Sequence, residues 1–199
     1  MNKICEISAG DFFTQKLMVK NIAEHSWEYC IKLSRNQKVL HVGCSDYPLF
    51  NPATNMHLHI SYCVRELHGC DPNGIEELKK YYNGAYYRSL EEVIKTKQEY
   101  DVILATNIIE HVQNPGNMLK QLFEIKFEKL FILVPNYSIS NQAKYDGEIF
   151  TEKIHPDHYA WYSPYTLFNL CKEPMQQIGA GCEMNFFDAQ NMISILITK

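Results

Sequence analysis

The feature that most constrains this chain is the alternation of short apolar runs with segments of helix length. The runs that we expect to form strands occupy residues 38–43, 66–71, 85–88, 101–105 and 130–134. The intervening segments with helical spacing of apolar residues occupy residues 56–64, 75–82 and 118–125. Strands that are connected through helices form a parallel sheet with helices on both of its faces. The alternation therefore predicts an α/β protein.

The two ends of the chain depart from this alternation. Apolar residues recur at roughly helical spacing over residues 11–35, which predicts a leading helix. Near the other end, residues 183–188 and 192–198 are strand-like runs joined by a tight connection, which predicts an antiparallel hairpin. A parallel sheet that ends in such a hairpin is a specific architecture.

Length and composition indicate one domain. A chain of 199 residues with 46% apolar residues supplies one core but is too short for two full domains. We therefore treat residues 1–199 as a single domain, with a leading helical segment at 1–36. The net charge is -4 and lysine and arginine do not cluster, so we expect no nucleic acid partner.

Cysteine usage and the lengths of the apolar stretches bear on the compartment. Seven cysteines occur without a C-x-x-C pair, and we interpret them as reduced thiols that pack as small apolar residues. The sequence shows neither the apolar stretch of a signal peptide nor one of the roughly 20 residues that cross a bilayer. We therefore expect a cytoplasmic protein that does not insert into membranes.

Four motifs occur in an order and spacing typical of one enzyme family. They are VLHVGCS at residues 39–45, HGCD at 68–71, YDVILATNIIEHV at 100–112 and HPDHYAWYSP at 155–164. Over residues 37–199 the chain resembles the class I methyltransferases that use S-adenosylmethionine. The resemblance implies a Rossmann-like, seven-stranded, mostly parallel sheet with helices on both faces and the C-terminal antiparallel hairpin. It also implies S-adenosylmethionine as cofactor and S-adenosylhomocysteine as product.

The resemblance places the cofactor at the carboxyl ends of the strands. Gly43 lets the backbone approach the ligand closely, and the helix that follows presents unpaired N–H groups to the cofactor's carboxylate. Asp71, at the end of the second strand, accepts hydrogen bonds from the ribose hydroxyls. The predicted cofactor-binding residues are Gly43, Cys44, Ser45, Asp71, Pro72, Ser89, Leu90, Asn107 and Ile108. The chain departs from the family pattern at Ser45 and Tyr47, where further glycines are usual.

Histidines mark the acceptor side, which the resemblance places at about residues 136–165. Removal of a hydroxyl proton requires a base, and the candidate catalytic residues are His111 and His158, with Glu110 beside them. Three interpretations stay open: a metal-free histidine base, a structural role, or a metal cluster. The candidate metal cluster consists of Glu110, His111, His155 and His158. We favour a site without metal, because Asn107 stands where the metal-binding small-RNA 2′-O-methyltransferases have their first glutamate.

The acceptor is predicted from a further resemblance. The NP pair at residues 51–52, the histidines of the MHLH segment at 56–59 and the motif at 155–164 are similar to bacterial methyltransferases associated with cell-surface glycan biosynthesis. This resemblance implies O-methylation of a sugar, a sugar-linked group or another small molecule. Aromatic side chains near the motif either wall an acceptor pocket or pack the segment onto the sheet: Tyr159, Trp161, Tyr162 and Tyr165.

Two alternatives remain for the function. One is a metal-assisted RNA 2′-O-methyltransferase, which requires a basic acceptor surface and a divalent ion. The other is a non-catalytic binding protein with the methyltransferase fold, which the depleted glycine turn at Ser45 and Tyr47 favours. Binding of the cofactor or of its demethylated product separates an enzyme from this last alternative.

Overall fold

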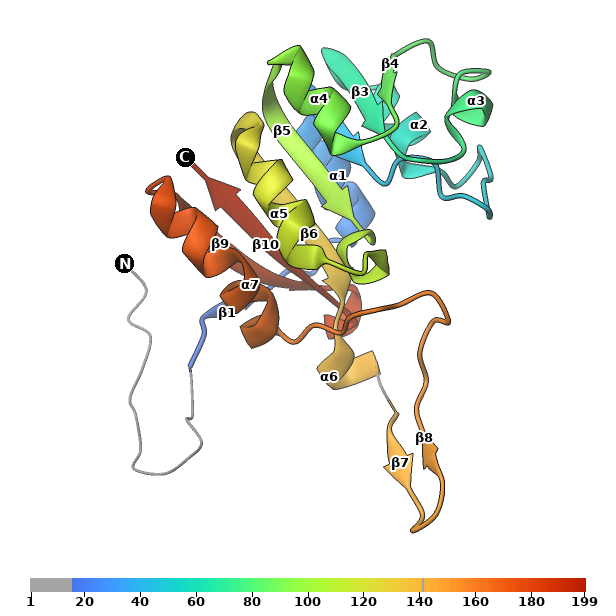
Figure 1. Ribbon diagram of the computed structural model, residues 1–199, viewed down its shortest axis with the longest axis vertical. Coiled ribbons are helices and arrows are strands. Elements are labelled where there is room, and N and C mark those ends of the chain that lie inside the picture. The colour runs from blue at the N-terminus through green and yellow to red at the C-terminus, as the bar shows by residue number, and fades with distance from the viewer. Residues whose placement is uncertain (1–15, 141) are drawn as a thin grey trace.

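A sheet of eight strands forms the centre of the molecule (Figure 1). The structure, a computed structural model, describes residues 16–140 and 142–199. Within these residues the strand order is β1-β9-β10-β6-β5-β2-β3-β4. The strands are β1 (Val19–Asn21), β2 (Lys38–Val42), β3 (Glu66–Cys70), β4 (Ala85–Tyr87), β5 (Glu99–Thr106), β6 (Lys126–Pro135), β9 (Gly181–Phe187) and β10 (Met192–Thr198). All neighbouring pairs are parallel except those that β10 makes with β6 and β9.

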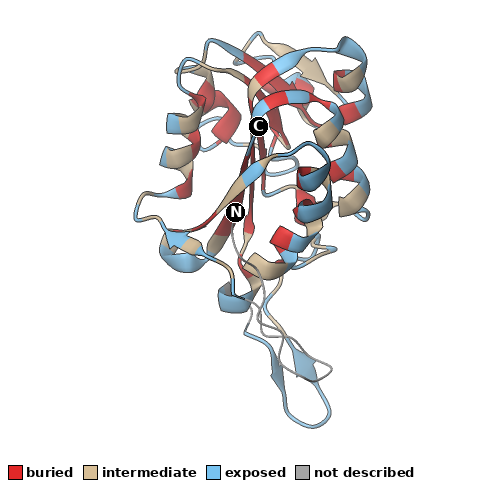
Figure 2. Ribbon diagram, turned by 90° about the vertical axis from the view of Figure 1, so that its left-hand side faces the viewer, coloured by how far each residue is buried: buried red, intermediate tan, exposed pale blue. Residues whose placement is uncertain are grey.

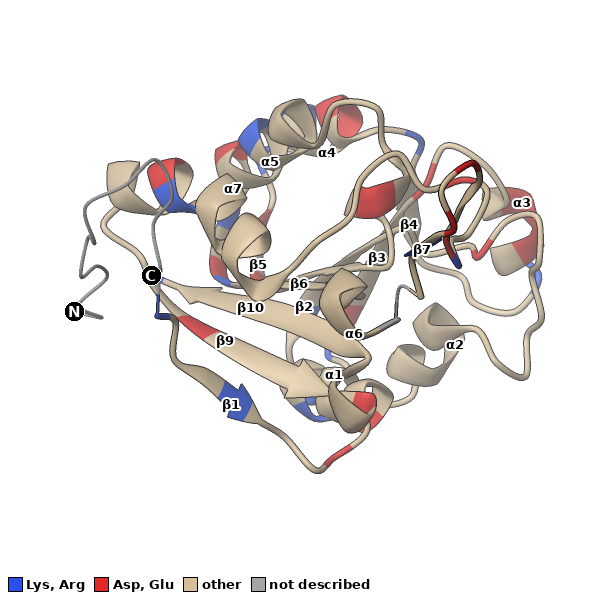
Figure 3. Cartoon of the chain, turned by 90° about the horizontal axis from the view of Figure 1, so that it is seen from below, with Lys and Arg blue, Asp and Glu red and all other residues tan. Residues whose placement is uncertain are grey.

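Helices cover both faces of the sheet (Figures 1 and 3). On one face lie α1 (Ser26–Ser34) and α2 (Met56–Ser61). On the other face lie α4 (Leu90–Thr96), α5 (Pro115–Glu124) and α7 (Pro164–Gln177). Short helical turns occur in the connections: α3 (Ile75–Leu78), η1 (Ile109–His111), α6 (Tyr137–Ser140) and η2 (Asp188–Gln190).

The alternation of side chains along the central strands builds a core on each face. Leu40 and Ile103 are fully buried and belong to the apolar cluster beneath α4, α5 and α7. Their chain neighbours Val39, Val102 and Leu104 belong to the cluster beneath α1 and α2. Successive residues of a strand point to opposite faces, so each apolar run supplies both clusters. Figure 2 shows the buried residues concentrated along the sheet and the inner sides of the helices.

Most of the predicted elements are present. The five expected strands correspond to β2 to β6, and the C-terminal pair forms the antiparallel hairpin of β9 and β10. The expected helices between the strands are present as α2, α3 and α5, with shifted ends. The mostly parallel α/β fold with helices on both faces is confirmed, although the described part of the sheet has eight strands rather than seven.

The N-terminal region differs from the helix predicted at residues 11–35. Residues 11–15 lie outside the described residues, and Val19–Asn21 forms β1, which pairs in parallel with β9. The helix α1 begins only at Ser26. Leu17 and Val19 pack against the core from the sheet edge, so their apolar character reflects an edge position rather than one face of a helix. The edge of β9 offers backbone partners that a local helical pattern does not reveal.

Two helices and a small hairpin had no counterpart among the predicted ranges. The helices are α4, which follows β4 directly and is capped by the Ser89 side chain, and α7. The hairpin consists of β7 (Lys144–Tyr145) and β8 (Phe150–Thr151) and projects away from the sheet (Figures 1 and 2). We call residues 144–151 the arm. Every residue of the arm is exposed. The arm therefore has no buried face that would produce an apolar pattern in the sequence.

The cysteines and the helices agree with two expectations. The cysteines of the described residues are all free, as predicted, and Cys5 lies outside those residues. None of the described helices has the length and apolar character needed to cross a membrane.

Candidate functional site

A large cavity lies at the carboxyl ends of β2, β3, β4 and β5. Its volume is about 940 Å³. In open α/β sheets, ligands bind in the crevice outside these strand ends. The residues predicted to bind the cofactor that line this cavity are Gly43, Asp71, Pro72, Ser89, Leu90, Asn107 and Ile108. Cys44 and Ser45 do not line it, because both are buried beneath the turn.

Gly43 ends β2 with a backbone that favours glycine. Its φ is 78°, in the left-handed region where a side chain is strained. A Cβ atom at this position would lie 3.0 Å from the Cβ of Ile108. The glycine therefore lets the strand end pass Ile108 closely, and both residues reach the same cavity wall.

Asp71 holds the two strand-end turns together. Its carboxylate accepts hydrogen bonds from the backbone N–H of Ser45 at 3.1 Å and of Asn73 at 3.0 Å. Each carboxylate oxygen has a second lone pair, and Asp71 lines the cavity. The residue therefore has capacity for ligand hydroxyls in addition to a structural role that its sequence position did not reveal.

The predicted geometry of the first turn is wrong in one respect. No helix directly follows Gly43, since α2 begins only at Met56. The side chain of Asn55 caps α2 by accepting from Leu58 N–H and also donates to the carbonyl of Cys44. The N-terminus of α2 is thus occupied by the protein itself. The intervening loop instead contributes cavity walls at Asp46, Tyr47, Pro48 and Leu49.

Asn107 continues the wall beyond β5. Its φ is 50°, a conformation that asparagine tolerates better than most residues. Its N–H donates to the carbonyl of Leu133 at 2.9 Å, which fixes the turn against β6. Ile108 and His111 follow on the same wall.

Arg88 is a cavity residue that the sequence reasoning missed. Its guanidinium donates to the Pro72 carbonyl at 3.3 Å and lies 3.4 Å from a carboxylate oxygen of Glu76. It stands next to Ser89, whose side chain caps α4. The sequence signal that could have identified Arg88 is its position at the end of β4, directly before the predicted cofactor-binding residue Ser89.

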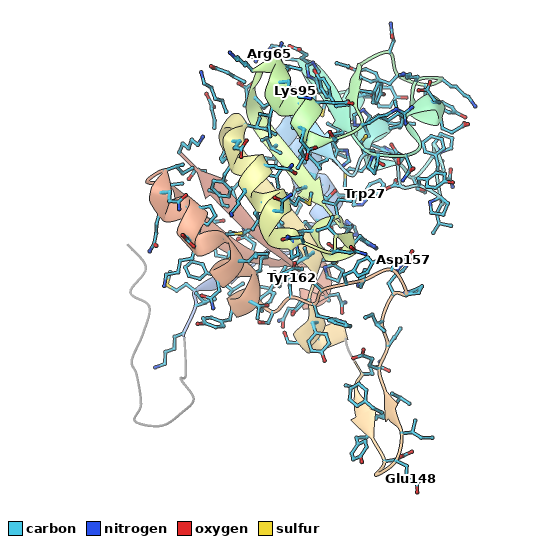
Figure 4. The ribbon with its side chains drawn as sticks, viewed as in Figure 1. Trp27, Arg65, Lys95, Glu148, Asp157 and Tyr162 are labelled. Carbon is cyan, nitrogen blue, oxygen red and sulfur yellow. The ribbon has the colours of Figure 1, made fainter. Side chains whose placement is uncertain are left out.

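A second cavity of about 540 Å³ adjoins the first, in the region predicted for the acceptor. His155 and Pro156 line both cavities. Trp161 and the buried Tyr162 line the second cavity, and Figure 4 shows Tyr162 and Asp157 in this part of the fold. Tyr159 and Tyr165 do not line it. Two of the four aromatic residues thus occupy the pocket wall.

Three histidines meet where the two cavities adjoin. The ring centroid of His111 lies 4.6 Å from that of His158 and 5.5 Å from that of His155, and the last two are 5.2 Å apart. The carbonyl of Glu110 accepts from the N–H groups of Tyr159 at 2.8 Å and of Ala160 at 3.3 Å. These bonds bring the 155–164 segment to the end of η1, so residues distant in sequence share one site.

Glu110 is the most unusual acid of the site. It is 1% exposed, lines the second cavity, and its carboxylate has no hydrogen-bond partner among the described residues. Burial raises the pKa of Glu110 to about 8. Burial also lowers the pKa values of His111 and His158, with their neighbouring histidines adding to the effect. Both imidazoles are therefore neutral at pH 7.

Charge is distributed without a basic patch in the described part of the chain. Figure 3 shows lysine and arginine spread singly along the elements rather than gathered on one face. Several are paired with acids, among them Lys38 with Glu66 and Arg65 with Asp101.

The sheet order, the single reversed strand β10 and the helices on both faces define the fold of S-adenosylmethionine-dependent methyltransferases. A scan against protein-family models finds no match, and a search of curated proteins finds none either. The similarity of this chain to known proteins comes from comparison with solved structures.

Three of these structures illustrate it. An S-adenosylmethionine-dependent methyltransferase from Archaeoglobus fulgidus has a TM-score of 0.58 at 15% identity, over 86% of this chain and 90% of that one. The N-terminal domain of EvdMO1, with S-adenosylhomocysteine and D-fucose, has a TM-score of 0.53 at 12% identity, over 86% of this chain and 79% of that one. A chain of the Pnkp1/Rnl/Hen1 RNA repair complex has a TM-score of 0.58 at 13% identity, over 87% of this chain and 40% of that one. The likeness shows the shared fold.

Proposed function

We propose that this protein is an S-adenosylmethionine-dependent methyltransferase that methylates a hydroxyl of a small acceptor. The observation that carries the proposal is the pair of adjoining cavities with a shared wall at His155 and Pro156. A methyltransferase must hold donor and acceptor in contact and in line. One cavity lies at the strand ends where the fold binds its cofactor and includes His111, and the other is lined by Glu110 and His158.

The first cavity supports binding of S-adenosylmethionine. Asp71 takes the ribose hydroxyls, while Gly43 and Ile108 allow close approach to the strand ends. Ser89 and Leu90 contact the adenine, and neighbours of this fold have been crystallised with S-adenosylhomocysteine. When bound, the cofactor supplies a sulfonium methyl group, which passes to the acceptor oxygen and leaves S-adenosylhomocysteine.

The residues at the shared wall act on the acceptor. The hydroxyl must lose its proton as its oxygen gains the methyl carbon, and His111, His158 and Glu110 surround the position where this occurs. Pro135 and Tyr162 exclude water from one side of the second cavity. The positions of Glu110 and His158 on the wall of the second cavity, with His111 on the wall of the first, support this assignment.

A sugar or a sugar-linked group is the proposed acceptor. The second cavity combines the aromatic faces of Tyr137 and Trp161 with the polar side chains of Gln142, Lys153 and Asn191. Sugars present both apolar faces and hydroxyls, which such a wall complements. The neighbour crystallised with D-fucose adds support, as does the resemblance to methyltransferases of surface glycan biosynthesis.

The first test is calorimetric titration of the purified protein with S-adenosylhomocysteine. We expect a dissociation constant in the micromolar range, which corresponds to about 8 kcal/mol. Transfer of labelled methyl from S-adenosylmethionine to a panel of free and nucleotide-linked sugars then identifies the acceptor. Absence of binding to either form of the cofactor would reject the enzyme and favour the non-catalytic binding protein.

RNA belongs in the same panel as a competing acceptor. The neighbour from an RNA repair complex has this fold, but the net charge of -4 and the dispersed cations oppose binding to a polyanion. We expect transfer to sugars and none to short RNA. If RNA is methylated and the labelling falls strongly with increasing salt, the acceptor is RNA and not a sugar.

A further inference from the structure

The three histidines at the shared wall have the arrangement of a metal site. Each of His111, His155 and His158 offers one ring nitrogen, and the three nitrogens all lie within 4.8 Å of one another. Among the described residues, no other group of three or more histidine, cysteine or acidic side chains meets this distance. The fold has therefore brought together three imidazole nitrogens from two distant segments.

The distances suit an ion that draws the rings together. Zn²⁺ binds imidazole nitrogen at about 2.0–2.1 Å with tetrahedral geometry, which separates the nitrogens by about 3.4 Å. The approach required is about 1.4 Å at most. His155 is exposed on the segment that follows the arm, and its Nδ1 accepts a hydrogen bond from the Asp157 N–H at 3.3 Å. The approach would exchange this local bond for a bond to the ion, or would use Nε2 as the ligand atom. The Glu110 carbonyl meanwhile holds the segment in place through Tyr159 and Ala160.

Glu110 provides a second, independent observation. A buried carboxylate without a partner costs at least about 1–3 kcal/mol, and neither oxygen of Glu110 has a partner among the described residues. Glu110 lines the same cavity as His155 and His158. Such an acid is suited to accept a hydrogen bond from a water or hydroxyl bound to a metal at the histidines.

We propose that His111, His155 and His158 bind one divalent transition-metal ion, with Zn²⁺ as the reference ion, and that its open position faces the acceptor cavity. Three imidazoles with an open fourth position are typical of catalytic zinc. The sequence pattern favoured a site without metal because Asn107 replaces an expected acid, whereas the fold supplies His155 as a third imidazole.

The role of the ion deepens the proposed function and rests on it. A metal lowers the pKa of a bound hydroxyl, so the acceptor oxygen would be held by the ion as its proton leaves to solvent. The oxygen's electron pair then forms the bond to the methyl carbon, and the sulfur keeps the pair of the broken C–S bond. His111 and His158 act in this scheme as ligands rather than as bases.

The test is a metal titration of untagged full-length protein after treatment with chelator. Co²⁺ serves as the spectroscopic probe, with Zn²⁺ added to displace it. We expect one Co²⁺ per chain, with the intense visible bands of low-coordinate Co²⁺ and full displacement by Zn²⁺. His155→Ala and His158→Ala should each weaken Co²⁺ affinity at least tenfold. His59→Gln, which alters a histidine outside the cluster, should leave affinity unchanged.

Parallel titration with S-adenosylhomocysteine separates the two proposals. If wild-type protein binds the product but not Co²⁺ or Zn²⁺, the metal site is rejected and the methyltransferase stands. Equal metal affinity in wild type and in both alanine variants also rejects the site. If metal binds as expected but the product does not, the site stands and its role in methyl transfer fails with the proposed function. Glu110→Gln should retain metal binding, which shows that the acid acts next to the ion and not as a ligand.

Discussion

The two cavities are built in different ways. The cofactor cavity is formed by residues at the ends of neighbouring parallel strands, so each wall position follows from a strand that is buried in the sheet. The acceptor cavity is formed largely by one excursion of the chain between β6 and α7, which includes the exposed arm. The first is a property of the fold, whereas the second is specific to this chain. The difference teaches that cofactor and acceptor specificity can change independently on one sheet.

The largest expected effect is a loss of turnover without an equal loss of cofactor affinity, which would distinguish the roles of the two cavities. His158→Ala and His111→Ala should lower turnover by about 10²–10⁴-fold, the usual contribution of proton transfer or hydroxyl activation. His158→Ala should change affinity for S-adenosylhomocysteine less than about threefold, because His158 lines only the second cavity, whereas His111 lines the cofactor cavity. Labelled methyl transfer and calorimetry measure the two quantities. Full activity in both variants would remove the histidines from the chemistry.

Acid should lower the stability of the sheet region, which carries the cofactor cavity, because two histidines are buried there. Burial lowers the pKa of His41 from 6.5 to about 4 and also lowers that of His57. The unfolded chain then binds protons that the folded chain cannot, so stability is complete above pH 6.5 and is lost as pH falls toward 4. For His41 alone the loss is about 3 kcal/mol.

Urea unfolding at pH 7.5, 6 and 5 checks this prediction. His57→Phe should reduce the pH dependence, and it should stabilise the protein at pH 7.5 by about 1 kcal/mol because both ring nitrogens of His57 lack partners among the described residues. His59→Gln serves as the control, since His59 bonds to the Ala53 carbonyl near the surface. An unchanged slope in His57→Phe would assign the acid sensitivity elsewhere.

Asp71→Ala tests whether the strand-end acid binds ligand or only holds its turn. Loss of hydrogen bonds to a charged acceptor, at about 1.5–3 kcal/mol, should weaken cofactor affinity tenfold or more. Asp146→Ala is a matched control, because Asp146 also accepts two backbone N–H bonds but lies in the arm. Calorimetry should show a loss for Asp71→Ala alone. Equal affinities in both variants would leave Asp71 with only its structural role.

The smallest effect should come from the arm. Phe150 is 61% exposed, so Phe150→Ser should change the free energy of unfolding by at most about 0.5 kcal/mol. Thermal and urea unfolding measure it. A loss of several kcal/mol would mean that the arm packs against something in solution, and the contrast between the two regions would then be weaker than the isolated chain indicates.

The parts of the fold that the sequence predicted are those with a local signal. Apolar runs that end in glycine or an acid located β2 and β3, and the same strand ends placed Gly43 and Asp71 at the cavity. The edge strand β1 was missed because its pairing with β9 joins distant segments, and the arm was missed because nothing in it is buried.

The same distinction between local signals and long-range contacts applies to the candidate site. Cys44 and Ser45 were assigned to the cofactor from their place in a motif, but both are buried and neither lines the cavity. The sequence grouped His155 and His158 with His111 as one candidate cluster, but it did not show the tertiary contact that joins the two segments, which is made by the Glu110 carbonyl. Local patterns thus locate strand ends, while proximity between loops depends on contacts that no spacing encodes.

The shared wall at His155 and Pro156 has a thermodynamic consequence. A ligand in either cavity that shifts this segment changes the free energy of binding in the other. Such coupling is reciprocal, so the factor by which a bound cofactor alters affinity for the acceptor must equal the factor by which the acceptor alters affinity for the cofactor. If either ligand shifts this shared wall, the affinity measured for one depends on the occupancy of the other cavity.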